Sequence, residues 1–118
     1  MSQAQLTVSH HMTADGVHVV VLAGDIDHTT TDLFRQALAA QGGFPPYTVI
    51  DFRAVTFMDS SGINVLVTAN NAARARDGWL RLAQTPKPVA EVLHIVGIDD
   101  LIPLYPTLDE ALAPQTAA

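Results

Sequence analysis

The sequence predicts an α/β fold: a mostly parallel five-stranded sheet with one antiparallel N-terminal strand, packed with about four helices. Strand-like and helix-like hydrophobic patterns alternate along most of the chain, as in strand–helix–strand units. Asp15-Gly16, a strong hairpin signal, separates two strand-like runs near the amino end. Hydrophobic residues make up 48% of the 118 residues and charged residues 15%, which favours a compact core. We expect one domain over 1–118, with its core at about 6–112 and a loose tail at 114–118.

The amino-terminal half is expected to hold two strands, a helix and a buried central strand. Strands over Leu6–His10 and Val17–Ala23 flank the Asp-Gly turn. A polar segment and three consecutive threonines follow, and any of these threonines could cap a helix that Gly42-Gly43 stops. Tyr47–Phe52 is β-branched and aromatic, which predicts a buried strand, and residues 53–57 are expected to form a loop after it.

The carboxyl-terminal half continues the alternation. The elements expected there are a helix from Asp59 to about Asp77, a strand over Trp79–Ala83, a helix that begins near Pro86 and Pro88 and ends at Gly97, a strand over Leu101–Tyr105 and a helix over Leu108–Leu112 capped by Thr107. Because Pro103 has no N–H to donate to a neighbouring strand, the last strand is expected at an edge of the sheet.

Composition and charge argue against several classes of protein. The formal net charge is −6, and Lys87 is the single lysine, so the chain has no basic footprint for nucleic acid or for an anionic membrane surface. It has no cysteine, and its longest apolar run, at 17–24, is too short to span a bilayer. We therefore expect no nucleic acid partner, no membrane insertion and a cytoplasmic location.

The most informative stretch is Asp59-Ser60-Ser61-Gly62, between the buried strand and the long helix. Its residue types start helices, and the carboxyl edge of a parallel sheet is where α/β folds place their sites. Plain helix capping is the simpler interpretation. Two features favour a site. Glycine in a first helical turn costs about 1 kcal/mol relative to alanine and leaves bare backbone for a partner to approach. Two adjacent hydroxyls also exceed what one cap requires.

A second candidate segment follows the second strand and carries Asp25, Asp27, His28 and Thr29. The end of a strand followed by a helix cap would again account for these residue types, with no functional role. If the second and third strands lie side by side, however, this segment and Asp59-Ser60 emerge at the same edge of the sheet. Together they would form one acidic, hydroxyl-rich surface.

Enzyme activity has no support in the sequence. Asp25, Asp27, Asp51 and Asp59 suggest the magnesium site of receiver domains, but such sites also need a lysine after the last strand, and Lys87 lies beside prolines instead. The histidines lack metal-ligand spacing. The chain has no Gly-x-Ser-x-Gly elbow, no Walker loop and no dinucleotide fingerprint. We therefore expect no catalytic residues, no metal and no cofactor.

Taken together, Gly24-Asp25-Ile26-Asp27 and Phe57–Ile63 resemble the STAS family, specifically the bacterial anti-sigma-factor antagonists. The similarity extends from about Leu6 to Leu112. It implies that an anti-sigma factor, which is also a serine kinase, phosphorylates the first hydroxyl after the aspartate, here Ser60. The unphosphorylated antagonist would bind that anti-sigma factor and free a sigma factor for transcription. Phosphorylation would break the complex, and a phosphatase would restore it, which is partner switching.

The resemblance also implies a partner-binding surface, whose expected residues are Asp25, Asp27, His28, Thr29, Asp59, Ser61, Gly62 and Asn64. Asn64 departs from the family, which often has glycine there, and this affects partner identity more than fold. Two alternatives share the fold. One is a scaffold or sensory STAS module that is never phosphorylated. The other is an accessory subunit of a membrane transport complex that docks on its ATPase.

Overall fold

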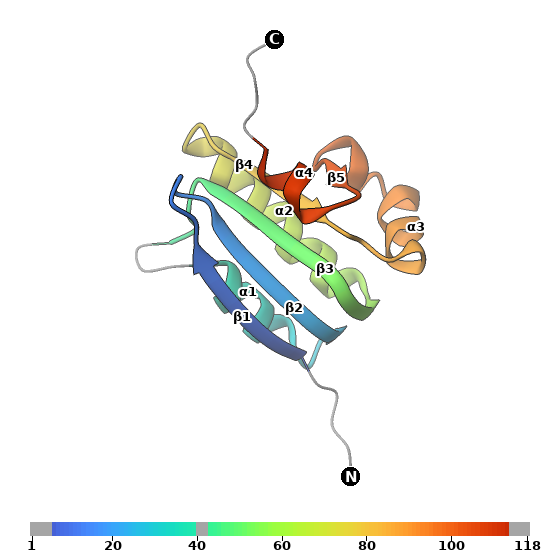
Figure 1. The fold of residues 1–118 in the computed structure, drawn as a ribbon. Coiled ribbons are helices and arrows are strands. Elements are labelled where there is room, and N and C mark those ends of the chain that lie inside the picture. The colour runs from blue at the N-terminus through green and yellow to red at the C-terminus, as the bar shows by residue number, and fades with distance from the viewer. Residues whose placement is uncertain (1–5, 40–42, 114–118) are drawn as a thin grey trace.

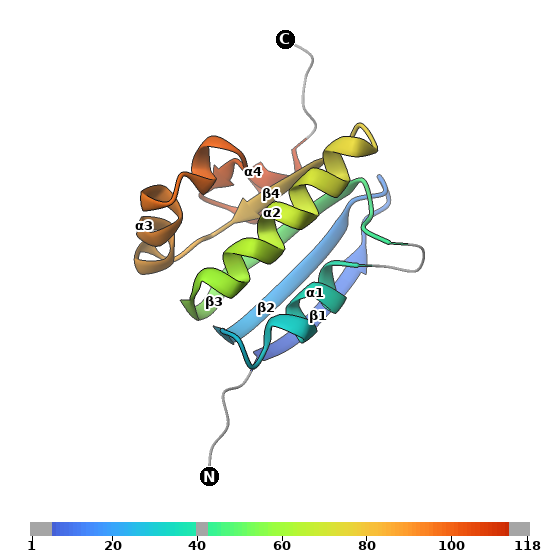
Figure 2. The ribbon, with the colours of Figure 1, turned by 180° about the vertical axis from the view of Figure 1, so that it is seen from behind.

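A computed structural model describes residues 6–39 and 43–113 as a five-stranded sheet with helices on both faces (Figures 1 and 2). In chain order its elements are β1 (Leu6–Met12), β2 (His18–Ile26), α1 (Thr31–Leu38), β3 (Tyr47–Met58), α2 (Ser60–Ala75), β4 (Trp79–Ala83), α3 (Lys87–Ile95), the 3₁₀ helix η1 (Ile98–Asp100), β5 (Leu104–Tyr105) and α4 (Leu108–Leu112).

The sheet has the spatial order β1-β2-β3-β4-β5, which equals the order in the chain. β1 runs antiparallel to β2, and the other neighbours are parallel. The expected fold class is therefore confirmed, including the edge position of the proline-flanked last strand. Because β2 and β3 are parallel neighbours, the segments that follow them emerge at the same edge of the sheet.

Both faces of the central strands are buried, which explains why their sequences are almost continuously apolar. On one face, Val20 and Ile50 pack with Phe34 of α1 and Leu66 of α2. Figure 2 shows α1 and α2 lying across this face, with α3 beside them. On the other face, residues of β2, β3 and β4 form a smaller cluster with Ala111 of α4. Helices thus cover both faces and leave the sheet's carboxyl edge for the loops.

The second and third strands are longer than predicted. β2 continues through Gly24 and Asp25 to Ile26, and the loop expected over residues 53–57 is part of β3. The prediction was wrong because irregular registers occur between Val21 and Ala23 and between Gly24 and Asp25. Such bulges break the two-residue alternation that marks a strand in sequence. The candidate segment therefore begins on a strand.

Other boundaries differ by smaller amounts. β1 extends to Met12, α2 begins at Ser60 and ends at Ala75, and β5 retains only the last two residues of its predicted range. Residues 101–103 of that range form a turn and a bend instead of strand, directly after η1. Thr30 is the residue before α1, but its side chain makes no capping bond to that helix. The expected stop at Gly42 and the tail at 114–118 lie outside the described residues.

Candidate functional site

The first turn of α2 places two neighbouring serines in different environments. Asp59 is in extended conformation just before the helix, and its Oδ1 accepts the Ser61 N–H at 2.9 Å. This is an N-cap, which satisfies a backbone donor that a helix start leaves free. Ser60, the first helical residue, is exposed, and no hydrogen bond recorded for the described residues involves its side chain. Ser61 is half-buried. The two hydroxyls are therefore not equivalent.

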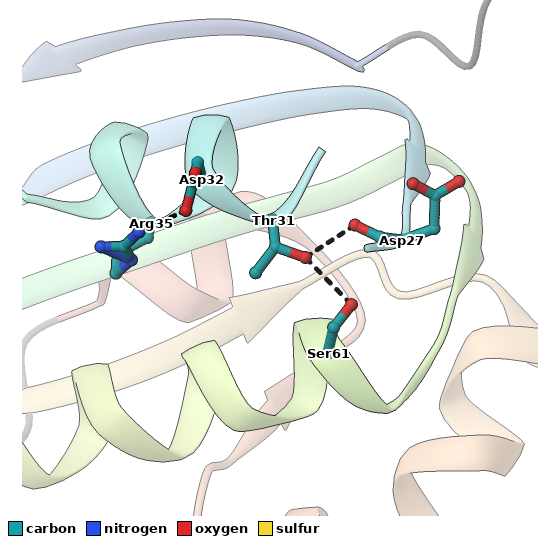
Figure 3. A network of polar contacts seen from close by, with 5 residues as sticks. All are labelled: Asp27, Thr31, Asp32, Arg35 and Ser61. Carbon is teal, nitrogen blue, oxygen red and sulfur yellow. Dashed lines mark hydrogen bonds and ion pairs between the residues drawn. The ribbon is translucent and has the colours of Figure 1, made fainter. Parts of the chain in front are cut away.

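The Ser61 hydroxyl is engaged on two sides. It donates to Asp59 Oδ1 at 2.5 Å, and its oxygen lies 3.0 Å from the hydroxyl of Thr31, the first residue of α1. Figure 3 shows Thr31 between Ser61 and Asp27, so that Thr31 links the first turns of α1 and α2 through residues 30 apart in sequence. Neither the Thr31 contact nor the reason for a second serine was visible in the sequence, because the contact joins two separate elements.

Gly62 has a packing role that the sequence analysis missed. The residue is buried, and a Cβ at this position would lie 2.6 Å from Cγ2 of Ile26 and 3.1 Å from two atoms of Met58. Contacts below 3.0 Å are not tolerated without movement. Glycine therefore lets the first turn of α2 sit against the ends of β2 and β3, and the predicted role of Gly62 in partner binding stays a prediction.

The segment between β2 and α1 is held by its own hydrogen bonds. Asp27 Oδ1 accepts from the Thr29 N–H at 2.8 Å and from the Thr29 hydroxyl at 2.6 Å. The Thr30 hydroxyl donates to the Asp25 carbonyl at 2.8 Å and accepts from the Asp27 N–H at 2.9 Å. Aspartate and threonine side chains stabilise turns in this way. The segment consequently has a defined shape without any bound partner.

The structure brings the two candidate segments together, as expected from the topology. The Asp59 N–H donates to the Ile26 carbonyl at 3.1 Å, so the end of β2 and the start of α2 are in direct contact. Asp25, on β2, accepts from the Thr56 hydroxyl of β3 at 2.5 Å and lies opposite Phe57 in the strand register. Phe57 is 49% exposed. It adds an apolar element to the surface that the sequence analysis did not select.

The remaining predicted contact residues lie on or near this surface. His28 and Asn64 are exposed, and Thr29 is exposed beside Asp27. Phe57 fell in the loop predicted over residues 53–57, and a large aromatic residue in a predicted loop was the signal in the sequence that marked it. We call the set Asp25, Asp27, His28, Thr29, Phe57, Asp59, Ser60 and Asn64 the edge surface. The roles of its members in binding stay predictions.

The edge surface is negatively charged. Hydrogen bonds from the Thr29 hydroxyl and N–H lower the pKa of Asp27, and the hydrogen bond from the Ser61 hydroxyl is the main cause that lowers the pKa of Asp59. Both carboxylates are thus ionised at neutral pH. The ion pairs of the described residues, Arg35–Asp32 and His94–Asp99, leave these two aspartates without a cationic partner. The negative charge is therefore available to a basic partner.

The described residues contain no group of three or more potential metal ligands, and none of their helices is long and apolar enough to cross a membrane. Two surface hollows of about 500 and 420 Å³ lie elsewhere, one next to Trp79 and Leu112, the other along α3 next to Ile95. Neither is lined by a residue of the edge surface. The candidate site therefore lies at the ends of two strands, outside both hollows.

Comparison with known proteins places this geometry in a family. The STAS domain family model matches residues 12–111. An anti-sigma-F factor antagonist of Mycobacterium tuberculosis, RsfA, is 32% identical over 111 residues, covering 91% of this chain and 84% of the relative.

Solved structures agree with this comparison. An anti-sigma factor antagonist from Mycobacterium paratuberculosis superposes with a TM-score of 0.79 at 33% identity, covering 92% of each chain. The unphosphorylated anti-sigma factor antagonist SpoIIAA, at 23% identity, shares the fold with a TM-score of 0.74, covering 90% of this chain and 93% of that one. The match spans nearly all the elements described above, and the chain therefore belongs to the STAS domain family.

Proposed function

We propose that this protein is an anti-sigma-factor antagonist that uses the edge surface to bind an anti-sigma factor, and that phosphorylation of Ser60 by that factor's serine kinase activity ends the interaction. Binding would free a sigma factor, and a phosphatase would reset the switch. The proposal places the protein in the cytoplasm, where such partners act on transcription. The names of the relatives at 32% and 33% identity support the antagonist role.

One observation carries the choice of Ser60. Its side chain is exposed at the start of α2, whereas the neighbouring Ser61 hydroxyl is engaged by Asp59 and Thr31. A kinase needs a hydroxyl that can approach its nucleotide, and Ser60 meets that need. The position also suits the product, because a phosphate at a helix N-terminus meets unpaired N–H groups and the positive end of the helix dipole. The domain is expected to stay folded when it is modified.

Charge explains how the modification would act on a partner. Phosphate adds about −1.5 to −2 charges to a surface that already carries Asp27 and Asp59. A partner that fits the unmodified hydroxyl closely would have to desolvate a dianion to keep the contact. A 100- to 1,000-fold loss of affinity requires roughly 2.7–4.1 kcal/mol. Burying one charged group without a compensating hydrogen bond costs an energy of this size.

The test combines site mapping with binding. The protein is incubated with ATP and each purified anti-sigma factor of its source organism that carries a serine kinase domain. Trypsin should release residues 54–74 as one peptide, since Arg53 and Arg74 flank it, and fragmentation distinguishes Ser60 from Ser61. We expect phosphate on Ser60. Ser60→Ala should retain binding in the presence of ATP, and Ser60→Asp should bind about 100-fold more weakly or worse.

Ser61→Ala is the matched control, because it removes the adjacent hydroxyl and leaves Ser60 in place. It should still be phosphorylated at Ser60. Binding that persists equally in wild type, Ser60→Ala and Ser60→Asp, with no phosphate on the 54–74 peptide, would contradict the switch and favour a STAS module that is never phosphorylated. Phosphate on Ser61 alone would move the site while keeping the antagonist role.

A further inference from the structure

The contacts around Thr31 contain one more oxygen pair than there are hydroxyl hydrogens. Three pairs lie within hydrogen-bond distance: Thr31 Oγ1 to the Asp27 carbonyl at 2.7 Å, Thr31 Oγ1 to Ser61 Oγ at 3.0 Å, and Ser61 Oγ to Asp59 Oδ1 at 2.5 Å. The two hydroxyls supply two hydrogens, and each hydroxyl donates only one. Two of the three pairs can therefore be hydrogen-bonded at the same time.

The acceptors decide how the hydrogens are placed. Asp59 is ionised, so it only accepts, and the short contact assigns the Ser61 hydrogen to it. The Ser61 oxygen is then left to accept from Thr31. The Asp27 carbonyl does not depend on Thr31, because it also accepts the Thr30 N–H at 3.0 Å. The arrangement in which all three acceptors of these pairs are bonded is an ordered chain from Thr31 to Ser61 to Asp59. Figure 3 draws its Thr31–Ser61 contact.

This chain joins the starts of two helices. Thr31 is the first residue of α1 and Ser61 the second of α2, and Asp59 caps α2 directly before Ser60. Both hydroxyl residues are half-buried, so water competes less for their bonds than at a fully exposed site. A donor that bonds to Ser61 polarises its O–H group and strengthens the bond from Ser61 to Asp59. The hydroxyl of Thr31 thus acts on Asp59 through Ser61.

We infer that Thr31 is a positioning residue that, through Ser61, fixes the Asp27–Thr30 segment and the Asp59 cap relative to each other, so that the edge surface is formed before a partner arrives. The structural coupling stands by itself, while its use in recognition rests on the proposed function. A preformed surface loses less conformational freedom on binding, which is the general advantage of preorganisation. Thr31 would therefore matter for recognition even where a partner does not touch it.

The inference is tested on the free protein by NMR. Thr31→Val keeps the shape of the side chain and removes the hydroxyl, and Thr31→Ser keeps the hydroxyl. We expect the pKa of Asp59 to rise in Thr31→Val and to return in Thr31→Ser. The amides of Thr30 and Ser61 should exchange about three- to tenfold faster in Thr31→Val, as the loss of one hydrogen bond of average strength implies.

Thr29→Val is the matched control. It removes a hydroxyl that bonds to Asp27 and belongs to the same segment but makes no recorded bond to α2. It should raise the pKa of Asp27 and leave that of Asp59 unchanged. A purely structural effect would change both variants alike. An unchanged pKa of Asp59 in Thr31→Val would overturn the inference.

A double variant with Ser61→Ala tests the path through Ser61, and Thr31→Ala takes the place of Thr31→Val in every measurement if Thr31→Val folds poorly. With the middle of the chain removed, adding Thr31→Val should cause no further rise in the pKa of Asp59, and an additive rise would contradict a path through Ser61. Because none of these measurements uses a partner or ATP, their outcome is independent of the phosphorylation assay. The coupling can stand when the switch fails, and the switch can stand when the coupling fails.

Discussion

At the scale of single residues, Gly62 tests whether the start of α2 is fixed by packing. Alanine would favour the helix by about 1 kcal/mol through its higher propensity. Its Cβ would, however, lie 2.6 Å from Cγ2 of the fully buried Ile26. Crowding of this kind in a packed core typically costs about 1–3 kcal/mol. We expect Gly62→Ala to lower the free energy of unfolding by about 1 kcal/mol, as measured by urea denaturation.

The control for this prediction removes the obstacle. In an Ile26→Ala background the 2.6 Å contact is removed and the 3.1 Å contacts with the Met58 side chain remain. The helix propensity of alanine should then offset the remaining crowding, and Gly62→Ala should be close to neutral. If Gly62→Ala destabilised both backgrounds equally, the cost would not come from Ile26. If it stabilised the wild type, the packing explanation for this glycine would be wrong.

The candidate site shows what single residues can reveal in a sequence. Asp59, Ser60 and the acidic segment were found because their residue types are typical of helix starts and turns, and because parallel topology places neighbouring strand ends together. The bond between Thr31 and Ser61 and the contact of Gly62 with Ile26 were not found. Both depend on how two elements approach each other, and no local pattern encodes that distance.

At the scale of elements, α4 depends on a buried arginine. The helix has five residues, far fewer than the roughly 12–15 that an isolated helix needs for even marginal stability. Arg81 of β4 is 1% exposed and donates from Nη1 to the carbonyls of Ala111 and Ala113, at 2.8 and 3.0 Å. Its guanidinium also lies 3.6 Å from the centre of the Trp79 ring. This side chain therefore attaches α4 to the sheet.

Replacing this arginine should release the helix. Arg81→Met keeps much of the apolar volume but loses the donors, and we expect it to cost about 2 kcal/mol, since hydrogen bonds from charged groups are each worth roughly 1.5–3 kcal/mol and some desolvation cost is recovered. Trp79 is the one tryptophan in the chain, so its fluorescence should report the change.

Arg81→Lys is the companion variant. It retains the charge but not the planar fork that stacks on Trp79 while donating two bonds, and it should be intermediate in stability. Wild-type stability and unchanged tryptophan emission in Arg81→Met would show that α4 is held by its apolar contacts instead. Arg81 sits in a strand that was predicted within its observed limits, yet its bonds reach 30 and 32 residues along the chain and carry no sequence signal.

The predicted and observed elements differ most where the sheet is irregular. β4 and α4 match their predicted ranges because their apolar runs are bounded by glycine, proline or a capping threonine. β3 was predicted six residues too short, since its exposed residues near Arg53 and Thr56 read as a loop. The bulged pairing with β2 keeps that stretch in the sheet, and pairing partners are not visible in one strand alone.

At the scale of the whole molecule, the ionisable groups respond to pH in opposite directions. His18 of β2 is buried, and its Nε2 lies 3.4 Å from Nδ1 of His10 on β1, while its own Nδ1 has no hydrogen-bond partner in the described structure. Burial is the main cause that lowers the pKa of His18, and the charges of His10 and His11 lower it further. On α3, the hydrogen bond to Asp99 raises the pKa of His94, which is exposed.

The sign of each contribution follows from which state binds more protons. The unfolded chain protonates His18 near the ordinary pKa of 6.5, above the value in the fold, so stability is lost as pH falls below about 6.5 and the loss is complete below the folded value. His94 acts oppositely: its contribution is present below about 6.5 and is lost as pH rises through its raised pKa. Because His94 is exposed, solvent screens its contribution.

The two lowered carboxylates act in a separate range. Asp27 and Asp59 contribute stability above about pH 3.8, and that contribution is lost as pH falls through their lower folded values. A decline that begins near pH 6.5 therefore belongs to His18, and a further decline below pH 4 to Asp27 and Asp59. The two ranges are separate enough to be assigned by experiment.

We expect the urea midpoint to decrease from pH 7.5 to pH 5, and His18→Gln to remove most of that decrease. Glutamine keeps a polar group at this position but does not titrate. The unfolded state therefore no longer binds more protons at position 18 than the folded state does. His94→Gln should have the opposite effect and steepen the decrease slightly, because it removes a contribution that favours the fold in acid. A decrease that is the same in wild type and His18→Gln would mean that the histidine pair between β1 and β2 is not the acid-sensitive part of the fold.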